Sequence, residues 1–123
     1  MAPTKDEIAL AQDGYTFTLT NTGTIDSSYS VYLDELTLTE GQKLDTNLVK
    51  INLLNTKTNH SVTKTYSQYV SDNTSLDTGN LTQGESVDYI LRIWLDYTAG
   101  NESQNKYFAS QIRVGVVQAN SIR

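Results

Sequence analysis

The sequence predicts an all-β protein, an antiparallel β-sandwich of two sheets with at most short helical turns. Thr, Ser and Asn supply 38 of the 123 residues, and β-branched Thr favours strands whereas Asn and Ser favour turns. Several segments also alternate apolar and polar residues, which is typical of a strand with one buried face. The chain has no cysteine, so its core has to form without disulfides.

The first three strands follow from this alternation. Every odd residue in Tyr15–Leu19 is apolar and every even one is Thr, which predicts a half-buried strand over 15–20. Residues 21–23 (Asn-Thr-Gly) end it, because Asn and Gly tolerate turn geometry. The same spacing predicts strands at 29–33 and 49–53, each with its odd residues on the buried face.

The strongest strand is predicted at 87–95. Its odd residues, from Val87 to Leu95, are all apolar, and we expect them to point inward against the odd residues of 15–19. A slip of one residue would expose this whole face to water, so the alternation also fixes the strand register. Phe108 and the alternating apolar residues of 112–116 indicate the last strand.

The remaining segments are less regular. The polar stretch 55–80 predicts a hairpin with weak strands near 61–66 and then a long loop. Thr4 and Glu7 have the spacing of a capping box, which predicts at most two helical turns before Gly14. Another single turn is predicted within 42–48.

Six or seven short antiparallel strands imply a sandwich of Ig-like or jelly-roll type. We divide the chain into three parts, which are an N-terminal lead segment (1–14), a single sandwich domain (15–118) and a C-terminal tail (119–123).

Charge excludes several classes of partner. The net charge is −5 and the sequence pI is near 4.6, and Lys and Arg form no cluster, so phosphate backbones and anionic lipid would repel the chain. We therefore expect no nucleic-acid partner. No run of 18 apolar residues occurs, so we expect no membrane span.

The residues do not predict an enzyme, a cofactor or a metal site. His60 is the single histidine and stands in the most polar part of the chain, outside any zinc motif. Asp96, Asn101 and Glu102 fall in one predicted loop, but they lack the ligand spacing of a calcium loop and are interpreted as solvated turn residues.

Two groups of residues are candidates for binding. The first is a possible interaction patch on the outer face of the last two strands, consisting of Ile90, Arg92, Trp94 and Arg113. If those strands pair, Arg113 would lie over the Trp94 ring in a cation–π contact. The patch is interpreted as a sheet face covered by Arg stems, as a protein contact or as a sugar-stacking platform.

The second group is a possible binding loop with Tyr66 and Tyr69, since tyrosine among small polar residues forms adaptable recognition surfaces. Alternatively, both rings fold over one end of the sandwich. Tyr89 follows Gly84 in the manner of the tyrosine corner of Greek-key sandwiches, and we expect a structural role for it.

Two parts of the chain resemble a known family. Residues 15–23 are similar to the opening strand of bacterial Ig-like surface modules. The pattern 81–96 (Leu-x-x-Gly-Glu-Ser-x-x-Tyr-x-Leu-Arg-Ile-Trp-Leu-Asp), followed by Phe108 and Ile112-x-Val114, resembles secreted proteins of Bacillota related to TasA and camelysin. This resemblance implies a secreted or cell-surface β-sandwich that assembles into fibres by donating an N-terminal strand to its neighbour.

We therefore expect a non-enzymatic extracellular module, structural or adhesive, such as a cell-surface or biofilm-matrix subunit of Gram-positive bacteria. Its partners would be copies of itself or related surface proteins, joined by strand complementation. The alternative is a module that binds a carbohydrate or a host protein through Trp94 and Arg92 or through the 55–80 segment.

Overall fold

The computed structural model describes residues 2–37, 43–104 and 106–118. In chain order the elements are β1 (Pro3–Thr4), α1 (Asp6–Ala9), β2 (Tyr15–Thr20), β3 (Ser27–Glu35), β4 (Val49–Asn55), β5 (His60–Thr65), α2 (Tyr66–Asp72), β6 (Asp77–Leu81), β7 (Ser86–Asp96), the 3-10 turn η1 (Asn101–Ser103) and β8 (Ser110–Gln118). The predicted tail 119–123 lies outside the described residues. Of the helical turn expected within 42–48, residue 42 lies outside the described residues, and 43–48 contain a turn at 46–47 but no helix.

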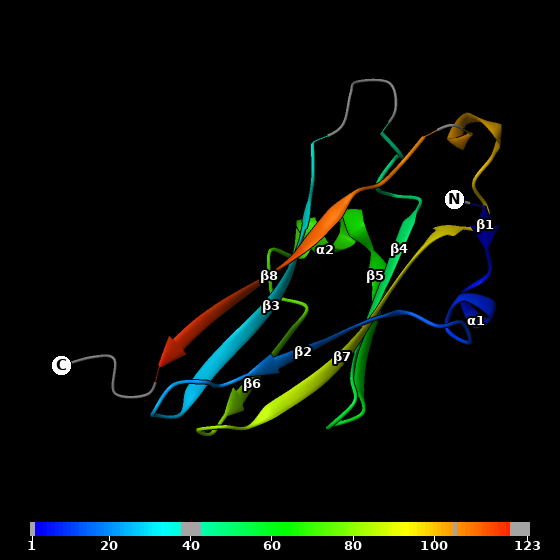
Figure 1. Ribbon diagram of the computed structural model, residues 1–123. Helices are drawn as coiled ribbons and strands as arrows, with labels where there is room; N and C mark the ends of the chain where they lie inside the picture. The colour runs from blue at the N-terminus through cyan, green and yellow to red at the C-terminus, as the bar shows by residue number, and fades with distance from the viewer. Residues whose placement is uncertain (1, 38–42, 105, 119–123) are drawn as a thin grey trace.

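The strands form two sheets that face each other, which confirms the predicted all-β sandwich (Figure 1). The larger sheet has the order β1-β7-β4-β5, and β2 also pairs with β7, on the same side as β1. The smaller sheet has the order β6-β3-β8. All pairs are antiparallel except β1 with β7, a short parallel pair of two residues. Neither helix in the described parts of the chain is long and apolar enough to cross a bilayer.

β7 supplies the centre of the core, as its alternation predicts. Val87, Tyr89, Leu91 and Leu95 are buried, and Ile93 packs partly buried against them. They meet the equally buried odd residues of β3 and β4, which come from the two different sheets. The alternation therefore predicts the core face of each of these three strands.

One member of the predicted core face is placed differently. Phe17 and Leu19 pack partly buried against the core, but Tyr15 is 62% exposed. Tyr15 begins β2, an outer strand of its sheet, and Phe17 stacks against its ring at 6.1 Å between centroids. The ring is therefore covered from one side, and the expectation that it points into the core was wrong.

The predicted lead segment is joined to the sandwich. Pro3 and Thr4 pair with Leu95 and Asp96 of β7, and α1 packs on the same strand. The predicted capping box does not form, because Thr4 belongs to β1 and its hydroxyl donates to the carbonyl of Ala2. The helix begins at Asp6, with Lys5 as an N-cap that makes no side-chain hydrogen bond.

The 55–80 segment is more ordered than its polarity predicts. The weak hairpin strand is found as β5, but the expected long loop contains α2 and β6. Thr65 caps α2 by accepting a hydrogen bond from the Gln68 amide, which leaves the buried rings of Tyr66 and Tyr69 on one side of the helix. β6 then pairs with the outer side of β3.

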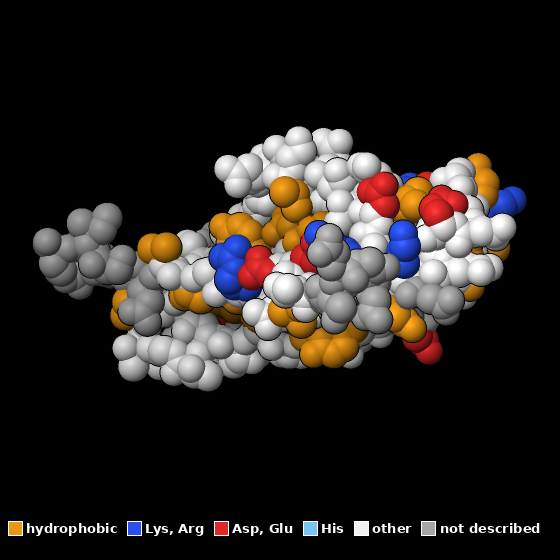
Figure 2. Space-filling view, turned by 90° about the horizontal axis from the view of Figure 1, so that it is seen from above, with side chains coloured by type: hydrophobic (Ala, Val, Ile, Leu, Met, Phe, Trp, Pro, Cys, Tyr) orange, Lys and Arg blue, Asp and Glu red, His pale blue; other side chains and the backbone are white. Residues whose placement is uncertain are grey.

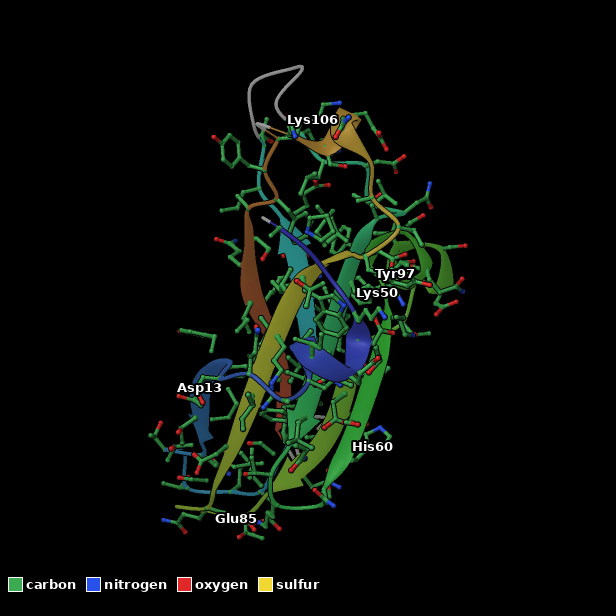
Figure 3. All side chains as sticks on the ribbon, turned by 90° about the vertical axis from the view of Figure 1, so that its right-hand side faces the viewer. Asp13, Lys50, His60, Glu85, Tyr97 and Lys106 are labelled. Atoms are coloured by element: carbon green, nitrogen blue, oxygen red, sulfur yellow. The ribbon has the colours of Figure 1, made fainter. Side chains whose placement is uncertain are left out.

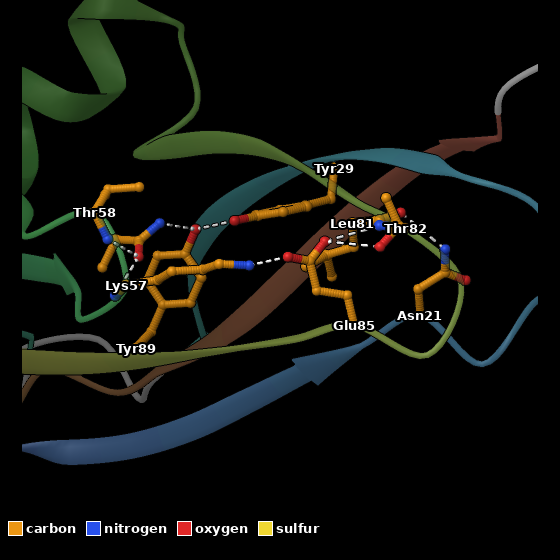
Figure 4. A network of polar contacts seen from close by, with 9 residues as sticks. Asn21, Tyr29, Lys57, Thr58, Leu81, Thr82, Glu85 and Tyr89 are labelled. Atoms are coloured by element: carbon orange, nitrogen blue, oxygen red, sulfur yellow. Dashed lines mark hydrogen bonds and ion pairs between the residues drawn. The ribbon is translucent and has the colours of Figure 1, made fainter.

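A buried polar network links the two sheets (Figure 4). The Tyr89 hydroxyl lies 2.5 Å from that of Tyr29 and donates to an Asp77 carboxylate oxygen at 2.7 Å. Asn55 donates to both Tyr89 and Asp77, at 3.3 Å each. Gly79 belongs to the same arrangement, because an added Cβ would lie 2.5 Å from the Tyr29 hydroxyl. Tyr89 thus has a structural role, but its hydroxyl bonds the side chains of Tyr29, Asn55 and Asp77, whereas the hydroxyl of a tyrosine corner bonds the backbone.

Candidate functional site

The four residues of the predicted interaction patch do not form one surface. Ile90, Arg92 and Trp94 lie on β7, whereas Arg113 lies on β8 in the other sheet. Trp94 is 5% exposed, because α1 packs over it and its indole N–H donates to Asp6 at 3.0 Å. The Trp94 ring is therefore buried, beside a hollow of about 260 Å³ that Trp94 lines together with Arg92 and residues within 9–15.

The other residues of that patch make contacts within the chain. The Arg92 Nε donates to the carbonyl of Gln12 at 2.8 Å, and Ile90 lies against Gly14, where a Cβ would come within 2.7 Å of it. β7 and β8 do not pair with each other in the described residues, so the expected Arg113–Trp94 contact does not form. These side chains hold the N-terminal segment on β7.

Arg113 stacks on a different aromatic ring. Its guanidinium lies 4.2 Å from the centroid of Tyr32, a neighbour on β3, and its Nε donates to Asp34 at 2.8 Å. The hydrogen bond to Asp34 raises the pKa of Arg113, so its guanidinium stays charged. Arg113 and Asp34 together hold the Tyr32 ring in place.

The predicted binding loop is a helix with both of its tyrosines turned inward. Tyr66 and Tyr69 are buried, and their hydroxyls accept hydrogen bonds from the backbone amides of Glu35 and Leu33, at 2.9 and 3.0 Å. Burial raises the pKa of Tyr66, with the charge of Glu35 adding to the effect. These rings fold over one end of the sandwich, which is the alternative that the sequence left open.

His60 and the candidate metal ligands lie at or near the surface, His60 and Asp96 at strand ends and Asn101 and Glu102 in η1. His60 opens β5 at the end of the sandwich where Glu85 also lies, away from Lys106 (Figure 3). Asp96 accepts a hydrogen bond from the Thr98 hydroxyl, and Glu102 accepts one from the Gly100 amide. Within the ranges that the structure describes, no three His, Cys, Asp or Glu side chains gather as a metal site would require.

Asp6 is the centre of a small ionic cluster beside Trp94. It accepts hydrogen bonds from Lys50 and Trp94, both at 3.0 Å. Burial alone would raise the pKa of Asp6, but the bonds from Lys50 and Trp94 outweigh burial, and the pKa is lowered from its usual 3.8. Lys50 and Tyr97 lie next to each other on the same side of the molecule (Figure 3).

The lowered pKa predicts an acid-dependent loss of stability. A carboxylate with a depressed folded-state pKa stabilises the fold above its unfolded pKa, and this stabilisation is lost as the pH falls through the folded value. We expect Asp6→Asn to be less stable than the wild type at pH 7 by up to about 1 kcal/mol. The difference should shrink between about pH 5 and pH 3, as thermal melts would record.

Glu7→Gln is the matched control. Glu7 is the exposed neighbour of Asp6 on the same helix, and this substitution also removes one negative charge. If Glu7→Gln changed the pH dependence as much as Asp6→Asn, the contacts with Lys50 and Trp94 would not be its cause.

An apolar groove runs along one flank of the sandwich, between β2 of the larger sheet and β8 of the smaller one. It has a volume of about 330 Å³. Its apolar lining consists of Leu19, Tyr29, Leu81, Val114 and Val116. We call it the β2–β8 groove.

Asn21 fixes one end of the groove. Its side-chain amide donates to the carbonyls of Ile25 and Leu81, at 2.8 and 2.9 Å, and its oxygen accepts from the Gly23 amide. Figure 4 shows the bond that ties the turn after β2 to the end of β6. The two sheets are thereby held at a set separation where the groove begins.

β8 presents a row of backbone groups along the open side of this groove. The Leu36 amide donates to the Ala109 carbonyl, in line with the β3–β8 register. Antiparallel strands alternate in which residues bond the partner, so odd residues of β8 face β3. The N–H and C=O groups of Ile112, Val114 and Val116 therefore point away from β3, and β8 is the outer strand of the described sheet.

The two strands beside the groove differ from the outer strands on the other flank. β2 carries no charged residue and β8 carries Arg113 alone, which is already paired with Asp34. On the other flank, β5 carries Lys64, and β6 is short and begins with Asp77. Charge and shortness protect an edge from pairing with another chain, so among the strands that the structure describes the β2 and β8 edges lack this protection.

Figure 2 shows the distribution of charged side chains on one face of the molecule. Lys and Arg side chains on that face lie scattered and do not merge into one basic patch. Comparisons of the whole chain with protein-family models, with curated proteins and with solved structures found no match. The fold and the flank thus define a β-sandwich with one open side, and the resemblance to the TasA and camelysin group stays a prediction.

Proposed function

We propose that the protein is a non-enzymatic structural or adhesive subunit of a bacterial cell surface or biofilm matrix. It would assemble by adding an extended strand of a neighbouring subunit to the β2–β8 flank. The extracellular location and the kinship with TasA rest on the resemblance of residues 15–23 and 81–96 to that group.

The observation that carries the proposal is the coincidence of an apolar groove with two unprotected edges. An added strand gains backbone hydrogen bonds at a free edge and places alternate side chains into pockets beneath it. Here the free groups of 112–116 supply the edge, and Leu19 and Val116 line the space beneath it. One extended segment could therefore bond the backbone of β8 and place its alternate side chains in the groove.

Charge also favours this flank as the meeting point of two copies. Each copy carries a net charge of −5 and would repel the other at most orientations. β8 contains no acidic residue and neither does β2. Approach along this flank therefore keeps the acidic surfaces apart.

The test uses two lysine substitutions at neighbouring positions of β8. Val116 lines the β2–β8 groove, whereas Val117 is on the opposite side of the strand, and the two are similarly exposed, at 58% and 64%. An inward-pointing lysine blocks strand addition. In sedimentation velocity, we expect the wild type and Val117→Lys to form larger species with rising concentration, and Val116→Lys to remain monomeric.

Electron microscopy of the same samples tests whether the larger species are filaments. A wild type that stays monomeric at every concentration and forms no filaments would rule out the proposal. Assembly by Val116→Lys equal to that of the wild type would move the contact away from this flank.

A further inference from the structure

A second hollow lies on the outer face of the three-stranded sheet, on the other side of β8 from the β2–β8 groove. It has a volume of about 530 Å³, which is within the range of small-molecule binding sites. Residues of all three strands line it, among them Ser28, Ser30, Tyr32, Thr78, Asn80 and Gly115. We call it the outer hollow.

Gly115 is the residue that leaves the outer hollow open. Glycine within a strand lowers stability and often marks a place where a ligand approaches closely. The backbone of Gly115 does not have a positive φ, unlike that of Gly84. A Cβ on Gly115 would lie 3.7 Å from Tyr32, an ordinary contact, whereas one on Gly79 would collide with Tyr29 at 2.5 Å.

Gly79 is thus explained by packing inside the sandwich, and Gly84 by its turn. Neither reason applies to Gly115. What its missing side chain does provide is space between Tyr32 and the row in which Ser30 lies opposite both Thr78 and Gly115.

The chemistry of the outer hollow selects for a neutral, hydroxyl-rich ligand. None of the residues that line it is charged, although the chain carries 23 Asp, Glu, Lys and Arg residues in all. Ser28 donates to the Asn80 amide oxygen at 2.7 Å, which sets the orientation of that amide. Hydroxyls and amides of this kind both donate and accept hydrogen bonds.

One wall of the outer hollow is aromatic and held in position. Arg113 stacks on the Tyr32 ring and is itself held by Asp34. A fixed ring loses little conformational entropy on binding, which is how tyrosine contributes to recognition surfaces. The ring adds an apolar surface to a floor of hydroxyls and amides, and sugar rings present the same two kinds of surface.

We propose that the outer hollow binds a neutral saccharide, with Tyr32 as its wall and Ser30, Thr78 and Asn80 as hydrogen-bonding groups. This site differs from the Trp94 platform and the tyrosine loop that the sequence suggested for carbohydrate. Its lining shares Tyr29 and Val116 with the β2–β8 groove, so the test below changes Gly115 and Thr78, which line the outer hollow alone of the two.

Titration by NMR tests the proposal, with cellohexaose, maltohexaose and chitohexaose as probes. We expect at least one of them to give saturable shifts confined to amides of β3, β6 and β8, with a Kd on the order of 1 mM. Gly115→Val should fill the hollow and weaken binding at least about tenfold. The fold should be retained, because valine suits a strand and the space is open.

Two further variants separate the site from general effects. Thr78→Val keeps the volume and removes one hydroxyl, and we expect it to weaken binding as well. Thr16→Val is the matched control, since Thr16 is an exposed outward threonine of β2 in the other sheet. It should bind like the wild type.

Three results would overturn the proposal. The first is the absence of saturable shifts with all three probes, and the second is binding that Gly115→Val leaves unchanged. The third is tighter binding of the anionic hexamer of galacturonate, because the residues that line the hollow are uncharged and the nearby Arg113 is already paired with Asp34. If Gly115→Val loses sugar binding and its self-association equals that of the wild type, the sugar site is supported separately from the proposed assembly.

Discussion

Replacing Tyr89 by alanine is expected to lower the free energy of unfolding by about 3–5 kcal/mol, the range for deleting a large buried aromatic ring. Tyr89 is 0% exposed and stacks on Phe17 at 5.3 Å between ring centroids. It also meets Tyr29 of the opposite sheet edge-on at 6.2 Å. Its removal would leave a cavity between the two sheets, as urea unfolding followed by circular dichroism would measure.

Tyr15→Ala is the matched control for this prediction. Tyr15 lies opposite Leu91 on the neighbouring strand, only two residues along β7 from Tyr89, but it is mostly exposed. We expect its replacement to cost less than about 1 kcal/mol. Equal losses in the two variants would contradict the placement of Tyr89 at the centre of the core.

Tyr89→Phe isolates the hydroxyl from the ring. Without it, Tyr29 and Asp77 would each lose a hydrogen-bond partner, and an unsatisfied buried polar group costs about 1–3 kcal/mol. We expect a loss of stability in that range. A neutral effect would mean that the polar network does not contribute to joining the sheets.

The network also sets an alkaline limit on stability. Burial, and then the hydrogen bonds with Tyr29 and Asp77, raise the pKa of Tyr89 far above its usual 10. A raised folded-state pKa means that the stabilisation is complete below the unfolded pKa and declines at higher pH, because only the unfolded chain can release the proton. Tyr89→Phe should therefore lessen the loss of stability above about pH 10.

The comparison of sequence with structure is most instructive at the two capping boxes. Thr4 and Glu7 have the required spacing and form none, whereas at Thr65 and Gln68 the threonine caps α2, although the Gln68 side chain donates to Asp72. The sequence signal for α2 was present, since apolar residues at 66, 69 and 70 follow the cap with helical spacing. The polarity of 55–80 predicted a hairpin and a long loop instead, and that prediction was wrong for 66–72.

Tertiary contacts decide between the two boxes. The rings of α2 are buried against β3, and their hydroxyls bond the β3 backbone. Thr4 instead pairs with Asp96 at the end of β7, which removes it from any helix. Local spacing cannot reveal such a partner, because the partner is 92 residues away in the chain.

β6 is a strand that the alternation of apolar and polar residues fails to predict. Gly79 occupies an inward position that would ordinarily carry an apolar side chain, because the Tyr29 ring from β3 fills its place. The alternation rule reads side chains one strand at a time. The rule therefore does not detect a strand whose buried volume is filled by a side chain of its neighbour. The outer hollow and the β2–β8 groove, which both adjoin this sheet, were not predicted either.

Replacing Trp94 by alanine is expected to destabilise the protein by about 3–5 kcal/mol, rather than to remove a ligand contact from an intact fold. Trp94 is covered by α1, and Ala9 of that helix is buried with it. The variant would also remove the indole N–H that Asp6 accepts. The chain has no other tryptophan, so unfolding of this variant cannot be followed by tryptophan fluorescence. Urea unfolding followed by circular dichroism gives the measurement instead.

Two comparisons separate covering by α1 from general loss of an aromatic ring. Tyr97→Ala, at a 59% exposed ring just beyond β7, should change stability by less than about 0.5 kcal/mol. In the wild type, the fluorescence of Trp94 should be blue-shifted and should move to longer wavelength on unfolding, because the folded chain shields the indole from water. Two results together would contradict the prediction: emission of the folded wild type at the wavelength of a solvent-exposed indole, and a Trp94→Ala variant as stable as the wild type. They would place α1 away from Trp94 and make this ring available as a binding surface.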